Sequence, residues 1–135
     1  MSFSDATESE ILSYVFRAVA AAWAGNANFW LAAHTANPGE AGTAVTSEAA
    51  YGSYGRVALA RPAAFTVAGS TLTNAALVQF PASTVAGADI THLSVVTTAA
   101  GAGQIIARFA LSSSLPTAIG IQPQFPIGAI SFLLD

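Results

Sequence analysis

Few side chains of this sequence could carry out chemistry. The chain has two histidines, seven acidic residues, four arginines and no cysteine. His34 could bind a metal ion together with Glu40 or Glu48 only if the loop between them folds back. Asp89 and His92 lie three residues apart, which places them on opposite faces of an extended strand. We therefore expect no metal site, no cofactor and no catalytic residue.

Motifs typical of nucleophiles and of nucleotide-binding loops are also missing. The segment 52–54 places a serine in a turn beside a strand and lacks the G-x-S-x-G pattern of a nucleophile elbow. The glycine-rich segment 101–106 lacks the third glycine of a dinucleotide fingerprint and precedes a strand, whereas the fingerprint opens a helix. The acidic residues Asp5, Glu8 and Glu10 suit the start of a helix. The sequence therefore predicts a protein that is not an enzyme.

The arginines and large aromatic residues remain as candidates for contacts with other chains. Arginine is enriched at interfaces relative to lysine, although a single surface ion pair is an alternative role for each one. Two tyrosines flank a Gly-Ser turn and could present an aromatic surface to a carbohydrate, or could pack against their own loop. The candidate interface residues are Arg56, Arg61, Arg108, Trp23, Trp30, Tyr51 and Tyr54.

The first part of the chain is predicted to form a helix over residues 5–22. Ser4 or Asp5 can cap its start, and Gly25-Asn26 supplies a stop signal. Apolar residues recur along it at the spacing of one stripe. We expect this stripe to face the core, with a contact to a neighbouring chain as the alternative. The stripe consists of Ile11, Leu12, Val15, Phe16 and Val19.

From residue 28 onward the apolar period changes to two, which predicts strands. About eight short strands separated by Gly, Pro, Asn and Ser clusters are typical of an antiparallel β-sandwich or small barrel. We therefore predict a mainly β fold in one domain, 1–135, with a helix at 5–22 and a β-sandwich at 28–134. The longest irregular segment, 36–53, is predicted to be an exposed loop. The less regular strands are expected at 64–68, 71–73, 90–97, 117–121 and 129–134.

The composition excludes several classes of protein. Only 8% of the residues are charged and 53% are hydrophobic, with a net charge of −3. A chain with so few cations has no basic patch for nucleic acid. We also expect no membrane span, no signal peptide and no disulfide scaffold. Its surface must consist mainly of short uncharged side chains, which suits a subunit whose outer faces are covered by neighbours.

Several segments, in this order, are similar to a family of small proteins of tailed bacteriophages that are usually labelled phage tail fibre proteins. The similarity covers almost the whole chain and departs from the family pattern at the Ala-rich junction 19–25. The segments are MSFSDATESEILSYVFR, FWLAAHTANPGEAGT, YGRVALAR, VQFPAST, THLSVVTTAAGAGQIIARFAL and GIQPQFPIGAISFLLD.

This resemblance implies a non-enzymatic structural subunit of the virion, of tail or tail-fibre type, which assembles through apolar, charge-poor surfaces. Its partners would be other virion proteins, either of the tail or the major capsid protein, and copies of itself, with a trimer as one option. Two alternatives remain open at this point. One is a capsid decoration, or cement, protein that stabilises the head shell, and the other is a carbohydrate-binding module.

Overall fold

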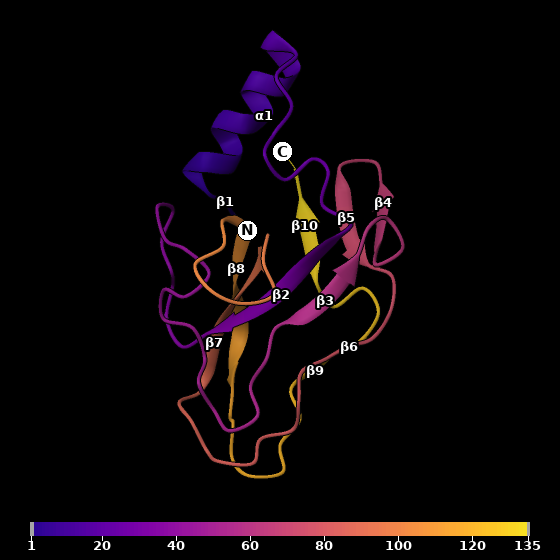
Figure 1. Ribbon diagram of the computed structural model, residues 1–135. Helices are drawn as coiled ribbons and strands as arrows, with labels where there is room; N and C mark the ends of the chain where they lie inside the picture. The colour runs from indigo at the N-terminus through magenta and orange to yellow at the C-terminus, as the bar shows by residue number, and fades with distance from the viewer. Residues whose placement is uncertain (1, 135) are drawn as a thin grey trace.

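A five-stranded antiparallel sheet forms the first layer of the protein. The computed structural model describes residues 2–134, and in it the strand order of this sheet is β1-β8-β7-β2-β3. β7 lies at the centre of the sheet, where it pairs with β2 on one side and with β8 on the other (Figure 1). The strands are β1 (Ser2–Phe3), β2 (Asn28–His34), β3 (Val57–Ala60), β7 (Ile90–Val96) and β8 (Ile105–Leu115).

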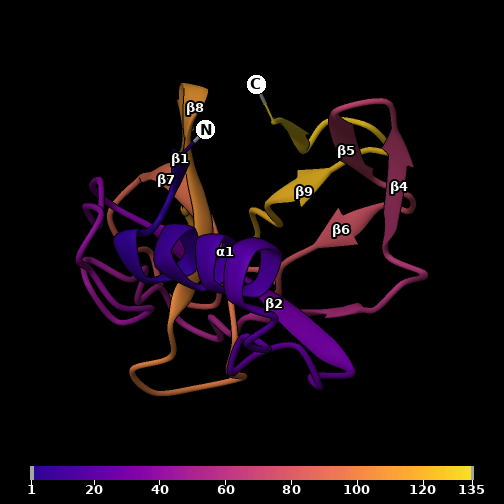
Figure 2. The same cartoon turned by 90° about the horizontal axis from the view of Figure 1, so that it is seen from above.

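Two smaller antiparallel sheets form the second layer. One has the order β10-β5-β4 and the other pairs β6 with β9. Seen from above, the strands of the second layer lie across from β7 and β8 (Figure 2). The strands are β4 (Phe65–Ala68), β5 (Thr71–Asn74), β6 (Val78–Gln79), β9 (Gln124–Phe125) and β10 (Ser131–Leu133).

The main core lies between these two layers. Leu31 of β2 and Leu93 of β7 are fully buried on the inner face of the large sheet. They share one apolar cluster with Phe80, Phe125 and Ile130 of the second layer. Because alternate side chains of a strand point to opposite faces, the period of two in the sequence places these residues in one layer. The predicted mainly β fold with antiparallel sheets and one N-terminal helix is confirmed.

Details of the strands differ from the prediction. The structure has ten strands in place of about eight. The segment 117–121 is not a strand, and the chain pairs with β6 a few residues later, at β9. Ile119 in that segment is 73% exposed, so its apolar side chains do not face the core. The short strand β1 is paired with β8 and has no pattern long enough to predict it.

The single helix, α1 (Asp5–Arg17), is shorter than predicted. Ser4 caps its start by accepting a hydrogen bond from the Thr7 backbone N–H. Ala18 ends it in the left-handed conformation, with φ of 53°, and its N–H bonds to the Tyr14 carbonyl. The predicted residues 18–22 instead form the beginning of a return segment toward β2. In that segment Ala21 is buried.

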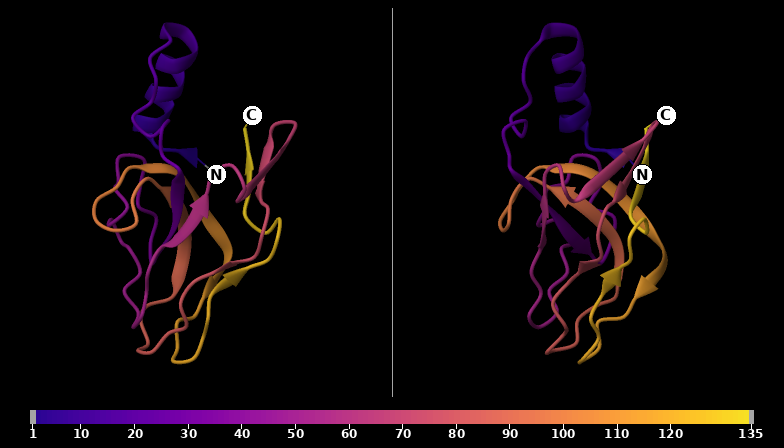
Figure 3. Two further views of the ribbon diagram at one scale, coloured as in Figure 1. Left: turned by 45° about the vertical axis from the view of Figure 1, so that its right-hand side comes forward. Right: turned by 90° about the vertical axis from the view of Figure 1, so that its right-hand side faces the viewer.

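α1 projects from one end of the β-sandwich. Figure 3 shows the helix and the β4–β5 hairpin rising from the same end of the molecule. Within residues 2–134, the structure contains no helix that is long and apolar enough to cross a membrane.

Candidate functional site

The structure places the first histidine in a structural role. The loop after β2 does fold back, so that His34 forms a β-bridge with Glu48. His34 is fully buried, with Nδ1 2.9 Å from the Thr46 carbonyl oxygen and Nε2 2.6 Å from the Ser94 hydroxyl. Burial lowers the pKa of His34 below its ordinary value. No group of three or more His, Cys, Asp and Glu side chains in the described part of the chain could hold a metal ion.

Arg56, Glu48 and Tyr54 form a hydrogen-bonded cluster that we call the loop clamp. Arg56 donates from Nε and Nη2 to the two carboxylate oxygens of Glu48, at 2.7 and 2.8 Å. The Tyr54 hydroxyl donates to the same carboxylate at 2.9 Å and accepts from the Ala33 backbone N–H. This ion pair raises the pKa of Arg56 above its ordinary value, mainly through the hydrogen bonds to Glu48. The side chain of Arg56 is only 2% exposed, so the pair lies inside the protein.

The loop clamp also holds a second loop. Arg56 donates to the backbone carbonyls of Thr98 and Gly101, at 2.9 and 2.8 Å. These two residues belong to the turn between β7 and β8. A single guanidinium therefore ties the loop after β2 to the next hairpin.

The other two candidate arginines have similar internal partners. Arg108 is buried and donates to the Phe3 carbonyl and to the Glu40 carboxylate, at 3.2 and 3.1 Å. Arg61 donates to the Trp23 and Asn26 carbonyls, at 3.2 and 3.1 Å. Each of the two arginines thus fixes a segment of irregular backbone. Their use at an interface between chains stays a prediction.

The four aromatic candidates are wholly or partly covered by their own chain. Tyr51 is 3% exposed, its hydroxyl donates to the Pro81 carbonyl, and its ring meets that of Tyr54 edge-on at 5.4 Å. Trp23 is half-buried against the Phe29 ring, and Trp30 packs half-buried on the outer face of the large sheet. The two tyrosines therefore pack their own loop, which was one of the two roles that we considered for them.

The first two turns of α1 are anchored to the body by polar contacts. The Ser4 and Thr7 hydroxyls donate to the Ile105 carbonyl. The Glu10 carboxylate accepts from the Trp23 indole at 2.6 Å and from the Gln104 amide at 2.8 Å. Burial by itself would raise the pKa of Glu10, but these hydrogen bonds outweigh it and the pKa lies below the ordinary value.

The second half of α1 exposes its large apolar side chains. Leu12, Val15 and Phe16 are 58%, 64% and 78% exposed, and we call these three residues the helix face. The expectation that the apolar stripe faces the core is therefore wrong for them. The physical reason is that α1 is held at its base and runs away from the sandwich (Figure 1). In consequence these three residues lie away from the body, whereas Ile11, nearer the base of the helix, is half-buried.

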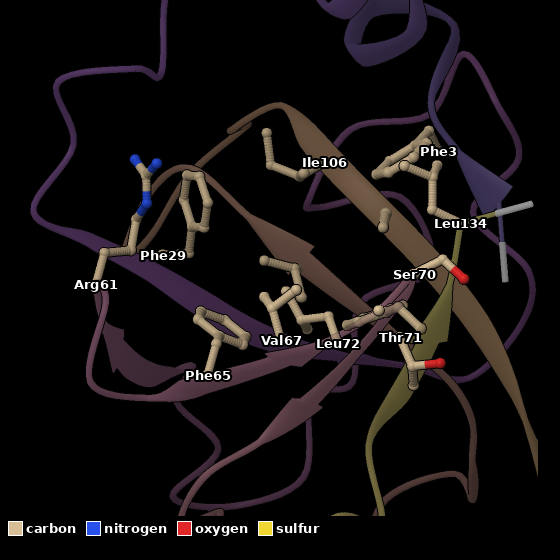
Figure 4. Close-up of a pocket in the computed structure, with 14 residues that line it drawn as sticks. Phe3, Phe29, Arg61, Phe65, Val67, Ser70, Thr71, Leu72, Ile106 and Leu134 are labelled. Carbon is tan, nitrogen blue, oxygen red and sulfur yellow. The ribbon is translucent and has the colours of Figure 1, made fainter.

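An apolar groove opens between the two layers of the sandwich. It has a volume of about 360 Å³. In Figure 4, Phe29 and Ile106 of the large sheet face Phe65 and Leu72 of the β4–β5 hairpin, with Arg61 at one end. Further lining residues are Phe3, Val67, Ser70, Phe132 and Leu134.

The guanidinium of Arg61 covers part of this groove. Its carbon lies 4.5 Å from the centroid of the Phe29 ring, which is a cation–π contact. The only salt bridges within residues 2–134 join Arg56 to Glu48 and Arg108 to Glu40. Arg61 therefore places a positive charge beside apolar walls without a carboxylate partner in that part of the chain.

Sequence reasoning did not predict the groove. Its walls come from seven strands, most of them distant from one another in the sequence, so no local pattern unites them. Phe65 and Leu72 belong to segments with an ordinary strand pattern. That pattern does not indicate that the β4–β5 hairpin leaves a gap between itself and the large sheet. Val67 and Leu134 gave a weak indication of an exposed apolar surface, because they are large apolar residues close to a turn and to the last residue.

One family model matches the chain. It is described as the Podophage GP4 fiber I protein gp80 family, and the match covers residues 2–132. No curated protein matches the chain.

Proposed function

Because this chain belongs to the podophage GP4 fiber I protein gp80 family, and so is a structural component of a phage virion, we propose that it builds a fibre by packing against copies of itself through apolar surfaces. The proposed role is non-enzymatic. The single observation that carries the proposal is the helix face, with Phe16 78% exposed on a helix that stands out from the body.

The distribution of charge supports this proposal. A free monomer normally stays soluble through many mixed surface charges. Here only 8% of the residues are charged, and three of the four arginines donate to groups within the same chain. Large apolar side chains are instead exposed at several places, and contiguous exposed apolar surface marks contact sites. Examples outside α1 are Val67, Ile127 and Leu134.

The first experiment measures the copy number of the protein in purified particles, by quantitative mass spectrometry against the major capsid protein. A fibre component is expected at a few per cent of the capsid protein. A ratio near one to one would instead identify a capsid decoration protein and would overturn the proposed location in the fibre. Absence from the particles would overturn both roles.

The second experiment measures the mass of the purified protein by light scattering over a range of concentrations and salt. We expect an oligomer whose dissociation constant changes little with ionic strength, because apolar contacts are not screened by salt. A protein that stays monomeric at the concentrations reached in assembly would contradict the proposal. Dissociation by modest salt would show that ion pairs dominate the contact instead.

A further inference from the structure

We infer that the helix face of one copy lies in the apolar groove of a second copy, and that the two copies exchange their helices reciprocally. This inference rests on the proposed function, since it names the surfaces through which the self-association would occur. Each surface lacks a partner within residues 2–134, and both belong to the same end of the molecule (Figure 3).

The helix face forms one continuous apolar ridge along one side of α1. At 100° per residue, Leu12, Val15 and Phe16 fall within an arc of about 100° around the helix axis. Thr7, which is buried against the body, falls outside that arc. The half of α1 that is anchored is thus separate from the half that presents apolar side chains.

The groove has the chemistry to receive such a ridge. Its walls are formed by the aromatic rings of Phe29 and Phe65 and by aliphatic side chains, as Figure 4 shows. Amphipathic helices bind to other proteins by laying their apolar side chains into grooves of this kind. The helix of the same chain does not fill the groove, because its three helix-face residues are exposed and none of them lines the groove.

The charges beside the two surfaces are complementary. Asp5 and Glu8 lie on the same side of α1 as the helix face, and both are exposed. Arg61 lies at one end of the groove without a carboxylate partner among residues 2–134. A docked helix that places its acidic start at Arg61 brings Phe16 toward the apolar end, near Phe3 and Leu134.

The exposed area favours a reciprocal pair over a single contact. The three residues of the helix face present roughly 300–400 Å², judged from the size of such side chains. A stable interface buries about 800 Å² on each partner. Two copies related by a two-fold axis bury one helix face and one groove on each copy, so the reciprocal pair buries about twice the area of a single contact.

Disulfide trapping tests the contact directly, because the chain has no cysteine of its own. Val15→Cys protein is mixed with Val67→Cys protein and oxidised. Val67 lines the groove and is 68% exposed, so the change should not disturb the fold. The matched control is Ile119→Cys, at a residue of similar exposure in the loop at the other end of the sandwich (Figure 1).

We expect roughly tenfold more mixed dimer from the 15–67 pair than from the 15–119 pair, because docking raises the effective concentration of the two thiols. The double variant Val15→Cys/Val67→Cys is expected to give a covalent dimer and no ladder. Equal yields from the two mixtures would overturn the inference. A ladder of larger species would overturn the reciprocal pair.

A second measurement separates failure of this inference from failure of the proposed function. Phe16→Asp and Val67→Asp are each expected to weaken self-association at least about tenfold, since docking would bury an unpaired charge, while Ile119→Asp leaves it unchanged. An oligomer that survives both changes would overturn the inference and leave self-assembly standing. A wild-type protein that never associates would overturn both. Circular dichroism of each variant confirms that it is folded.

Discussion

The loop clamp and the helix face use opposite kinds of side chain in opposite settings. In the loop clamp, charged and polar groups lie inside the protein, and Arg56, Glu48 and Tyr54 bond to one another and to backbone. On the helix face, Leu12 and Phe16 lie outside, where the described part of the chain gives them no cover. An ordinary soluble domain has the reverse arrangement, with charges outside and large apolar residues inside.

The difference shows that the few charged side chains and the many apolar ones have separate roles in this chain. Irregular loops have many backbone carbonyls that need donors, and an arginine can satisfy several of them at once. No buried side-chain nitrogen or oxygen within residues 2–134 lacks a hydrogen-bond partner. The charges thereby stabilise the single subunit. The exposed apolar side chains are the ones that we propose for contacts between subunits.

The strongest test of this contrast is one substitution made in two places. Phe80→Ala removes a ring that is fully buried in the core and should lower the free energy of unfolding by about 3–5 kcal/mol. Phe16→Ala removes a ring that is 78% exposed and should change it by less than about 0.5 kcal/mol. Urea denaturation of both variants at a concentration where the protein is monomeric gives the two values. Equal losses would show that α1 packs against its own body.

The second test removes the centre of the loop clamp. Arg56→Ala removes two of the three donors to the Glu48 carboxylate and the donor to two backbone carbonyls, and it should cost about 2–3 kcal/mol of stability. Arg17→Ala is the matched control, because Arg17 is exposed on the last turn of α1 and forms no salt bridge within residues 2–134. Thermal unfolding followed by circular dichroism compares the two variants. A melting temperature that falls equally in both would contradict an internal role for Arg56.

The third test uses pH and the buried histidine. The pKa of His34 is lower in the folded protein than its ordinary value of 6.5, because burial disfavours the charged ring. The unfolded chain therefore binds a proton at a higher pH than the folded chain does. His34 makes its full contribution to stability above about pH 6.5 and loses it as the pH falls below that value.

We expect the unfolding free energy of the wild type to decrease between pH 6.5 and pH 5, by no more than about 1.4 kcal/mol per pH unit for this one group. His34→Gln should give a flatter profile over the same range, although its stability at pH 7 is lower. Parallel profiles for the two proteins would show that other groups cause the change. Urea titrations at a series of pH values supply the measurement.

The smallest expected effect concerns the base of α1. Glu10→Gln weakens the acceptor of the Trp23 indole and Gln104 amide and should cost less than about 1 kcal/mol at pH 7, since hydrogen bonds of charged groups near the surface contribute little. The pKa of Glu10 is lowered in the folded state, so its contribution is present above pH 4.5 and is lost as the pH falls through the folded value. The difference between variant and wild type should therefore vanish in strong acid, as measured by thermal unfolding.

The sequence predicted those parts of the fold that depend on local pattern. The start of β2 was placed at residue 28, where the apolar period changes to two, and β7 was placed at 90–97, within a residue of its bounds. The segment 117–121 was wrongly predicted as a strand, since three neighbouring apolar residues can equally well lie in an exposed loop. The length of α1 was overestimated, because nothing in the alanines after Arg17 signals a left-handed turn at Ala18.

The candidate site depended on tertiary placement and was therefore predicted less well. Arg56 and Arg61 were singled out as interface candidates, which stays a prediction, and their partners within the chain include backbone carbonyls on distant loops, which no spacing along the chain reveals. The same stripe of apolar residues on α1 fits a core helix and an interface helix alike. The structure decides between them only by the direction in which the helix leaves the sandwich.

The attachment of α1 has a mechanical consequence for a fibre protein. The base of the helix is bonded to β8 through Ser4 and Thr7, and the chain that returns from its tip is bonded to the same base through Trp23 and Glu10. A force applied at the tip of the helix would therefore pass through two connections. In the proposed fibre, α1 would carry force from a neighbouring subunit into the large sheet through both of them.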